Sequence, residues 1–210
     1  MPFHLTPKEG EFLVRLARKA VEEHLKSGKT TDVPRDVPLK LMQRCGVFVT
    51  INSVRHGEKK LRGCIGFPYP TTPLTRAVIE SAINSATRDP RFHPVSPEEL
   101  DHIVFEMSVL TPPQPVKAEK PTDYPSKIKV GQDGLIVEKG YYKGLLLPQV
   151  PIEWEWDEEE FLCQCCIKAG LPPDCWLLKG TNIYKFSCVI AQEIEPRGKI
   201  KFIDMRKQGE

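Results

Sequence analysis

Long hydrophobic runs are absent from this chain of 210 residues. Its longest apolar runs, such as Gly144–Pro148, are far shorter than the roughly 20 residues that a membrane-spanning helix needs. The N-terminal residues Met1–Leu5 also lack a basic stretch followed by an apolar one, which is the pattern of an export signal. We therefore expect a cytoplasmic protein without a membrane segment.

An excess of charge of one sign is missing too. The chain has 30 basic and 28 acidic residues, so its formal net charge is only +2. This near balance argues against bulk electrostatic attraction to nucleic acid, although it leaves room for a local basic patch. The seven cysteines are odd in number, and without an export signal they indicate reduced thiols and not a disulfide framework.

Several sequence motifs of enzymes are absent as well. The chain has no Walker A motif, no G-x-G-x-x-G fingerprint, no H-E-x-x-H and no G-x-S-x-G. These absences remove the motif evidence for a P-loop nucleotidase, a dinucleotide-binding enzyme, a zinc protease and a serine hydrolase. They leave the cofactor, if there is one, unknown.

The pattern of apolar residues in the first half predicts helices and strands without a regular alternation. Thr6 and Glu9 form a capping box before a helix that Gly28 ends. Two alternating stretches then predict a β-hairpin, and the remaining signals predict a helix, a helical turn and a strand; the predicted segments are 46–54, 59–65, 74–88, 96–99 and 103–109. Cys64 lies near the exit of the hairpin.

The second half predicts a hairpin, a helix and a late strand. The hairpin turns at Lys139–Tyr142, the helix begins after Asp157 and ends near Gly170, and the strand covers Tyr184–Ile190. Together the two halves favour an α+β fold with a mainly antiparallel sheet flanked by helices.

The stretch Leu61-Arg62-Gly63-Cys64-Ile65-Gly66 carries the first candidate chemistry. A cationic neighbour lowers the pKa of a thiol, so Arg62 and Arg91 favour a nucleophilic Cys64. Gly63 and Gly66 would expose backbone N–H groups that bind an anion. The competing interpretation is a tight strand exit with a small buried thiol, because cysteine is among the most buried residue types.

Arg62 and Arg91 are also candidates for a guanidinium clamp on a phosphate or carboxylate. In the alternative interpretation, Arg91 pairs with Asp89. His93 is a lone histidine in a proline-rich loop, a setting more typical of a residue that faces solvent or bonds to the backbone than of an acid–base catalyst. Gln149 is a polar residue in a stiff loop and is a candidate ligand-binding residue.

Cysteine and tryptophan clusters near the C-terminus have two interpretations each. Cys163 and Cys166 have metal-type spacing, but they fall within the predicted helix, where small apolar packing explains them better, so we predict no metal site. Trp154 and Trp156 could stack nucleic-acid bases, but their spacing of two predicts one face of a strand and a place in the core. Cys45 and Cys188 lie in apolar, strand-like contexts typical of a core.

Five motifs occur in the order seen in the AMMECR1 family, which this chain resembles over nearly its whole length: Leu61–Gly66, Asp89–Phe92, Gly134–Val137, Leu147–Val150 and Lys168–Leu171. The resemblance implies an AMMECR1-type domain over residues 5–195, with a larger and a smaller lobe and a groove between them, and a C-terminal tail over 196–210. It also implies a fold grouped with nucleotide-, nucleic-acid- and peptide-binding folds, and partners such as a Memo-like protein or a radical-SAM enzyme. Where the family often has proline after Asp-Pro-Arg-Phe, this chain has His93, so no family-wide catalytic base is expected there.

Two functional hypotheses therefore stand. In the first, a groove at Gly63–Gly66 binds an anionic ligand (a nucleotide, nucleic acid or peptide) through Arg62, Arg91 and Gln149, and Cys64 acts as a nucleophile. In the second, the chain is a non-enzymatic binding or adaptor module, and Cys64 is structural.

Overall fold

The computed structural model describes residues 4–207 and divides them into two compact units. The first unit comprises residues 4–110 and 189–203, and the second comprises 111–188 and 204–207. Each unit is described below by itself. Residues 1–3, at the start of the segment examined for an export signal, and 208–210, at the end of the predicted tail, lie outside the described residues.

The first unit is built on a five-stranded sheet with the strand order β2-β1-β3-β8-β9. Antiparallel pairing joins β1 to β2 and to β3. The strands are β1 (Gly46–Arg55), β2 (Glu58–Phe67), β3 (Ile103–Leu110), β8 (Cys188–Glu193) and β9 (Ile200–Asp204). Because β2 stands at one end of this order, one of its edges has no neighbouring strand among residues 4–207.

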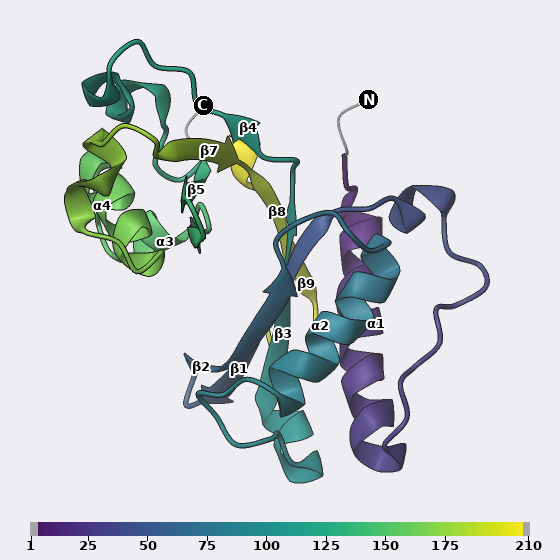
Figure 1. Cartoon of the computed structure of the whole chain (residues 1–210). Coiled ribbons are helices and arrows are strands. Elements are labelled where there is room, and N and C mark those ends of the chain that lie inside the picture. Colours follow the sequence, from purple (N-terminus) through teal and green to yellow (C-terminus); the bar gives the residue numbers. More distant parts are fainter. Residues whose placement is uncertain (1–3, 208–210) are drawn as a thin grey trace. The chain divides into compact units, whose positions relative to one another are not determined.

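Two long helices cover one face of this sheet (Figure 1). The helices are α1 (Pro7–Ser27) and α2 (Leu74–Thr87), and two short 3-10 helices accompany them: η1 (Leu39–Met42) and η2 (Pro97–His102). The apolar residues of α2 pack on β1, whose alternate residues Val47, Val49 and Ile51 are fully buried, and the buried stripe of α1 packs against α2 and β3. This packing forms the core of the first unit.

The predicted caps of the first unit are confirmed. Thr6 accepts a hydrogen bond from the Glu9 N–H, and the Glu9 carboxylate accepts from the Thr6 N–H at 2.7 Å. Gly28 adopts φ +72° and ends α1. Ser96 and Glu99 form the same type of capping box on η2, as the sequence predicts.

The second unit contains a four-stranded sheet with the order β4-β7-β5-β6, in which each pairing is antiparallel. Its strands are β4 (Gln114–Pro115), β5 (Gly134–Lys139), β6 (Tyr142–Leu146) and β7 (Asn182–Phe186). Its helical segments are η3 (Pro121–Asp123), η4 (Pro125–Lys127), α3 (Val150–Glu153), α4 (Glu158–Lys168), η5 (Pro173–Leu177) and η6 (Met205–Lys207). A separate core joins α4 and η5 to the sheet.

The α+β prediction is confirmed, and two local predictions are wrong. The predicted strand over Tyr184–Ile190 is two strands, β7 and β8, which belong to different sheets and meet at Ser187. The stretch around Trp154 is α3 followed by a turn and not a strand, and Trp154 is 66% exposed. In addition, β9 falls within the segment 196–210 that we predicted as a tail.

Of the cysteines predicted to pack as small apolar residues, Cys45, Cys166 and Cys188 are buried, whereas Cys163 is only partly buried. Cys165, Cys166 and Cys175 belong to the core of the second unit, and Cys45 and Cys188 are buried as well. The Cys165 thiol donates to the carbonyls of Leu135 and Gly144 at 3.6 and 3.5 Å, and burial raises its pKa to about 12. Packing in the core therefore explains the presence of these buried cysteines.

Candidate functional site

The stretch Leu61–Gly66 lies inside β2, and not in a loop after it. Its two glycines allow neighbouring groups to approach the strand closely. A Cβ atom on Gly63 would lie 2.1 Å from the carbonyl oxygen of Ser85 on α2, and one on Gly66 would lie 2.6 Å from the ring of Phe48. Close packing within the first unit therefore requires these glycines.

The Asp89 carboxylate binds the backbone between the two glycines that we predicted to bind an external anion. The N–H of Cys64 donates to Asp89 Oδ2 at 2.8 Å. The adjacent N–H of Ile65 donates to Ser85 Oγ at 2.8 Å, and that hydroxyl donates to the Val49 carbonyl at 2.7 Å. The N–H groups of Cys64 and Ile65 therefore bind a carboxylate and a hydroxyl of the chain itself, whereas anion binding at Gly63 and Gly66 stays a prediction.

Asp89 also fixes Arg91. The Arg91 Nε and Nη2 atoms donate to Asp89 Oδ1 and Oδ2 at 2.9 and 2.7 Å, in a two-point ion pair. The Asp89 side chain is only 2% exposed, whereas that of Arg91 is 52% exposed. The pair was one of the two interpretations drawn from the sequence, and its result is an oriented guanidinium that faces outward over a buried carboxylate.

These contacts lower the pKa of Asp89 from 3.8 to about 2, with the hydrogen bonds from Arg91 as the largest cause. Because the pKa is lower in the folded protein, the ionised carboxylate adds stability that is fully present above pH 4 and is lost as the pH falls toward 2. We expect Asp89→Asn to lower the free energy of unfolding by about 1–3 kcal/mol at pH 7, since it removes a charged acceptor from a buried N–H. Urea unfolding between pH 2 and 7 tests this: the difference from the wild type should shrink below pH 4. Asp101→Asn, at an exposed ion pair, is the matched control, and an equal loss in both variants would contradict the prediction.

Arg62 is the extra residue of a β-bulge, because Ile51 pairs with Gly63 while Asn52 pairs with Leu61. Its Nε and Nη2 atoms donate to the two oxygens of Glu99 at 2.8 and 3.0 Å. Nη1 donates to the carbonyl of His93 at 2.8 Å, and Nη2 also contacts that of Pro94 at 3.2 Å. Most of the donors of Arg62 therefore bind the protein itself, and the side chain is 16% exposed.

A shallow depression of about 460 Å³ lies over these two motifs. We call it the arginine depression; its lining residues are Arg62, Pro90, Arg91, Phe92 and His93. The guanidinium of Arg91 lies 5.4 Å from the centre of the Phe92 ring. The carboxylates that balance the two arginines, Asp89 and Glu99, are not among the lining residues, so the depression presents mainly cationic and flat apolar groups.

Cys64 is held by neighbours on the adjacent strand. It pairs with Thr50 on β1, and the Thr50 hydroxyl donates to its sulfur at 3.2 Å. Burial raises the pKa of the Cys64 thiol, and the carboxylates of Glu106 and Asp89 raise it further, whereas the Thr50 hydrogen bond and the charge of Arg91 act in the opposite direction. The expectation that arginine would leave Cys64 with a lowered pKa is therefore wrong, because burial outweighs the cation.

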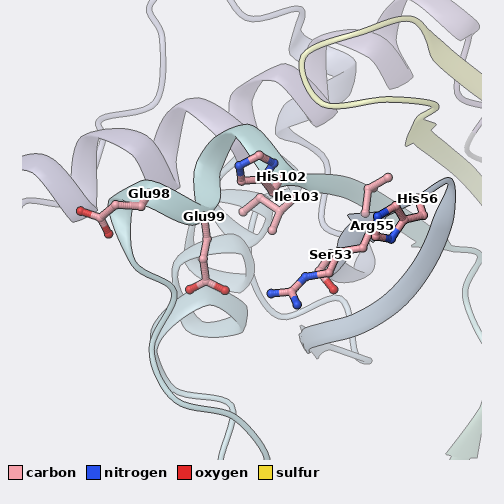
Figure 2. A pocket seen from close by; sticks show the side chains of 8 residues that line it. Ser53, Arg55, His56, Glu98, Glu99, His102 and Ile103 are labelled. Atoms are coloured by element: carbon pink, nitrogen blue, oxygen red, sulfur yellow. The ribbon is translucent and has the colours of Figure 1, made fainter.

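A second pocket, of about 470 Å³, lies beside η2, the short helix that contains Glu99. Figure 2 shows Arg55 and His56 from the β1–β2 hairpin on one side, and Glu98, Glu99 and His102 from η2 on the other. Glu99 therefore has two roles: it lines this pocket, and its carboxylate accepts hydrogen bonds from Arg62. The pocket presents both signs of charge and does not contain the cysteine.

Gln149 belongs to the second unit, where it precedes α3. Its carbonyl accepts from the Glu153 N–H at 3.1 Å, and its side-chain oxygen lies 3.9 Å from the Cys188 sulfur. The site described above is thus formed by the first unit alone. Within residues 4–207, no group of three or more His, Cys, Asp or Glu side chains is arranged to hold a metal ion.

Four residues that organise the site were not predicted from the sequence. These are Thr50, Ser85, Asp89 as the acceptor for Cys64, and Glu99 as the partner of Arg62. A polar residue on an otherwise apolar helix face was the available signal for Ser85, and the Asp-Pro-Arg-Phe motif contained Asp89. No spacing in the sequence indicated that Glu99 would pair with Arg62.

Comparisons with known proteins agree on one family. The family model described as AMMECR1 matches residues 14–191. Protein PH0010 of Pyrococcus horikoshii is 58% identical over 202 residues, which cover 96% of this chain and 98% of that protein. A protein of Methanothermobacter thermautotrophicus is 57% identical over 191 residues, covering 90% and 96% of the two chains.

A solved structure matches as well. The crystal structure of the uncharacterized protein PH0010 from Pyrococcus horikoshii superposes with a TM-score of 0.88 at 59% identity, covering 93% of this chain and 96% of that one. Its agreement supports the α+β architecture. Among residues 4–207, none of the helices is long and apolar enough to span a bilayer.

Proposed function

This chain belongs to the AMMECR1 family, and we propose that it is a binding module whose first unit holds an anionic group of a ligand at the arginine depression, without covalent chemistry at Cys64. The observation that carries the proposal is the Asp89–Arg91 pair. The buried carboxylate fixes Nε and Nη2 of Arg91, and among the described residues no hydrogen bond engages Nη1.

A guanidinium oriented in advance loses little side-chain entropy when it binds a phosphate or carboxylate. Phe92 and Pro90 lie beside it and offer flat apolar surface to the body that carries the charged group. The ligand class that fits is therefore an anion on a ring or an apolar chain, such as a nucleotide or an acidic peptide. Arg62 contributes mainly by shaping the depression, because Glu99 and two carbonyls already occupy most of its donors.

Titration calorimetry with three probes tests the proposal: ATP without metal, tripolyphosphate and adenosine. We expect the two anions to bind and adenosine to bind far more weakly. Arg91→Gln should weaken ATP binding about tenfold or more, because a charge-assisted hydrogen bond contributes about 1.5–3 kcal/mol. Arg91→Lys, which keeps the charge and loses the planar fork, should give an intermediate affinity.

Arg76→Gln is the matched control, since Arg76 is an exposed arginine of the same unit that pairs with Glu80 outside the depression. Each variant needs a thermal unfolding curve, because Arg91 also neutralises Asp89. Equal ATP affinity in the wild type and in folded Arg91→Gln would show that the ligand binds elsewhere.

The cysteine-dependent enzyme is the competing function, and the reactivity of Cys64 decides it. Because burial raises the pKa of its thiol, we expect Cys64 to react with iodoacetamide more slowly at pH 7 than the same cysteine in the urea-unfolded chain. Its rate should rise at a higher pH than in the unfolded chain. Mass spectrometry of tryptic peptides measures the rate at each cysteine, and Cys163, the other partly exposed thiol, serves as the internal comparison. A Cys64 that reacts faster than in the unfolded chain would favour the enzyme.

The partners implied by the family resemblance, a Memo-like protein or a radical-SAM enzyme, stay predictions, as does the cytoplasmic location. A binding module is compatible with either partner, because contact with a partner protein needs a surface and not turnover.

A further inference from the structure

An exposed apolar surface follows α3 in the second unit. Ile152 is 52% exposed and Trp154 is 66% exposed. The indole of Trp154 stacks on that of Trp156, with ring centres 6.1 Å apart and planes 17° apart, and Trp156 packs against the core of the second unit. We call Ile152 and Trp154, together with the acidic residues Glu153 and Glu155, the docking surface. The exposed indole of Trp154 therefore rests on the half-buried indole of Trp156 and is not a loose side chain.

The backbone presents Trp154 outward. Glu155 adopts φ +55°, which is uncommon for a residue other than glycine. The N–H of Glu155 donates to the Ile152 carbonyl at 3.3 Å, and the N–H of Trp156 donates to the Pro151 carbonyl at 2.9 Å. This turn leaves Trp154 exposed, while Trp156 is half-buried against the core of the second unit.

The residues that flank Trp154 in the sequence are mostly acidic. Six of the eight residues 153–160 are acidic: Glu153, Glu155, Asp157, Glu158, Glu159 and Glu160. None of them forms an ion pair with a lysine or arginine among residues 4–207, whereas fourteen such ion pairs occur elsewhere in the same range. The N-terminus of α4 stabilises the last four of these charges, but Glu153 and Glu155 precede that helix and have no such compensation.

We propose that the docking surface binds a basic segment of a partner protein, with an arginine or lysine of that segment over the Trp154 ring, its charge balanced by Glu153 and Glu155, and an apolar side chain against Ile152. A cation over a tryptophan face is favourable, and the neighbouring carboxylates strengthen the attraction. The same charges repel the phosphates of nucleic acid and of anionic membranes, so Trp154 does not stack bases. This surface is independent of the arginine depression, which lies in the other unit.

A synthetic peptide of alternating arginine and leucine is the probe, and a peptide of alternating glutamate and leucine is its control. We expect the basic peptide to bind the full chain with an affinity that falls as salt rises, and the acidic peptide not to bind. Trp154→Ala should weaken binding about tenfold, and the pair Glu153→Gln with Glu155→Gln should weaken it further and flatten the salt dependence. Nuclear magnetic resonance of the Trp154 indole N–H reports contact directly.

Tyr141→Ala is the aromatic control, because Tyr141 is fully exposed in the same unit but lies outside the docking surface, and Glu58→Gln is the charge control. Both should bind the basic peptide like the wild type. Equal binding by the wild type and Trp154→Ala would overturn the proposal. So would sedimentation that shows a dimer of this chain which Trp154→Ala dissociates, since the occupant would then be a second copy.

Discussion

Replacing Glu193 by alanine should lower the free energy of unfolding by about 3–5 kcal/mol. Glu193 is fully buried on β8, where its Oε1 accepts from Arg18 Nε at 2.8 Å and its Oε2 accepts from Arg18 Nη2 at 2.5 Å. Oε2 also accepts the backbone N–H of Phe105 at 3.0 Å. Without the carboxylate, the guanidinium of Arg18, which is 4% exposed, would keep only the more distant Glu22 carboxylate, 3.7 Å away, as a counterion, and a strand N–H would lose its acceptor. Urea unfolding at pH 7 measures the loss.

Two further variants separate the missing charge from other causes. The double variant Arg18→Met with Glu193→Leu should be markedly more stable than Glu193→Ala, because it leaves no unpaired charge in the core. Glu195→Ala, two residues along at an exposed position, should change stability by less than about 0.5 kcal/mol. A Glu193→Ala protein as stable as Glu195→Ala would mean that the ion pair does not stabilise the first unit.

This pair also shows where inference from the sequence ends. The apolar spacing of 7–27 predicts the buried stripe of α1, and its caps predict both ends, because these signals are local. Arg18 lies within that stripe beside Ala17, and no local signal indicates that a glutamate 175 residues away neutralises it. A buried ion pair between distant elements depends on the order of strands in the sheet, and the spacing of apolar residues does not determine that order.

The candidate site was partly predictable for a similar reason. The motifs that contain Cys64 and Arg91 do meet, as proposed from the sequence, since Arg91 Nη2 lies 3.4 Å from the Cys64 carbonyl. The lowered thiol pKa expected from this proximity was wrong, whereas a reaction at Cys64 stays a prediction. Asp89 takes both the N–H of Cys64 and the guanidinium, and burial controls the thiol pKa. Burial depends on neighbours from Thr50 and β3, which the motif itself does not reveal.

The wrong strand predictions have a physical cause as well. Tyr184–Ile190 is a continuous run of strand-forming types, but the chain passes from one unit to the other near Ser187, whose N–H donates to the Thr111 hydroxyl and not to a neighbouring strand. Trp154 and Trp156 have a strand-like spacing, yet Pro151 starts a helical turn and Glu155 takes a positive φ. A spacing of two residues alone does not distinguish a strand from a helical turn whose end stacks the two indoles on each other.

Gly63→Ala should cost about 3 kcal/mol of stability. The new Cβ atom would lie 2.1 Å from the backbone oxygen of Ser85, and 3.0 Å from the carbon of the same carbonyl. A backbone oxygen cannot rotate away as a flexible side chain does, so α2 and β2 must separate. That separation would stretch the Ser85 hydrogen bonds to Ile65 and Val49, which are 2.8 and 2.7 Å long.

Gly57→Ala is the matched control, because Gly57 lies in the turn before the same strand, has φ +83° and has open space where a Cβ atom would be placed. Its cost is therefore the backbone strain alone, about 1 kcal/mol. If Gly63 instead served to let a ligand approach the strand, Gly63→Ala would leave the unfolding free energy unchanged and lower only the affinity for ATP. A large stability loss at Gly63 together with a small one at Gly57 would show that Gly63 serves the packing of α2 on the sheet. Of the two motifs Leu61–Gly66 and Asp89–Phe92, it would then be Arg91 in the second that faces a ligand.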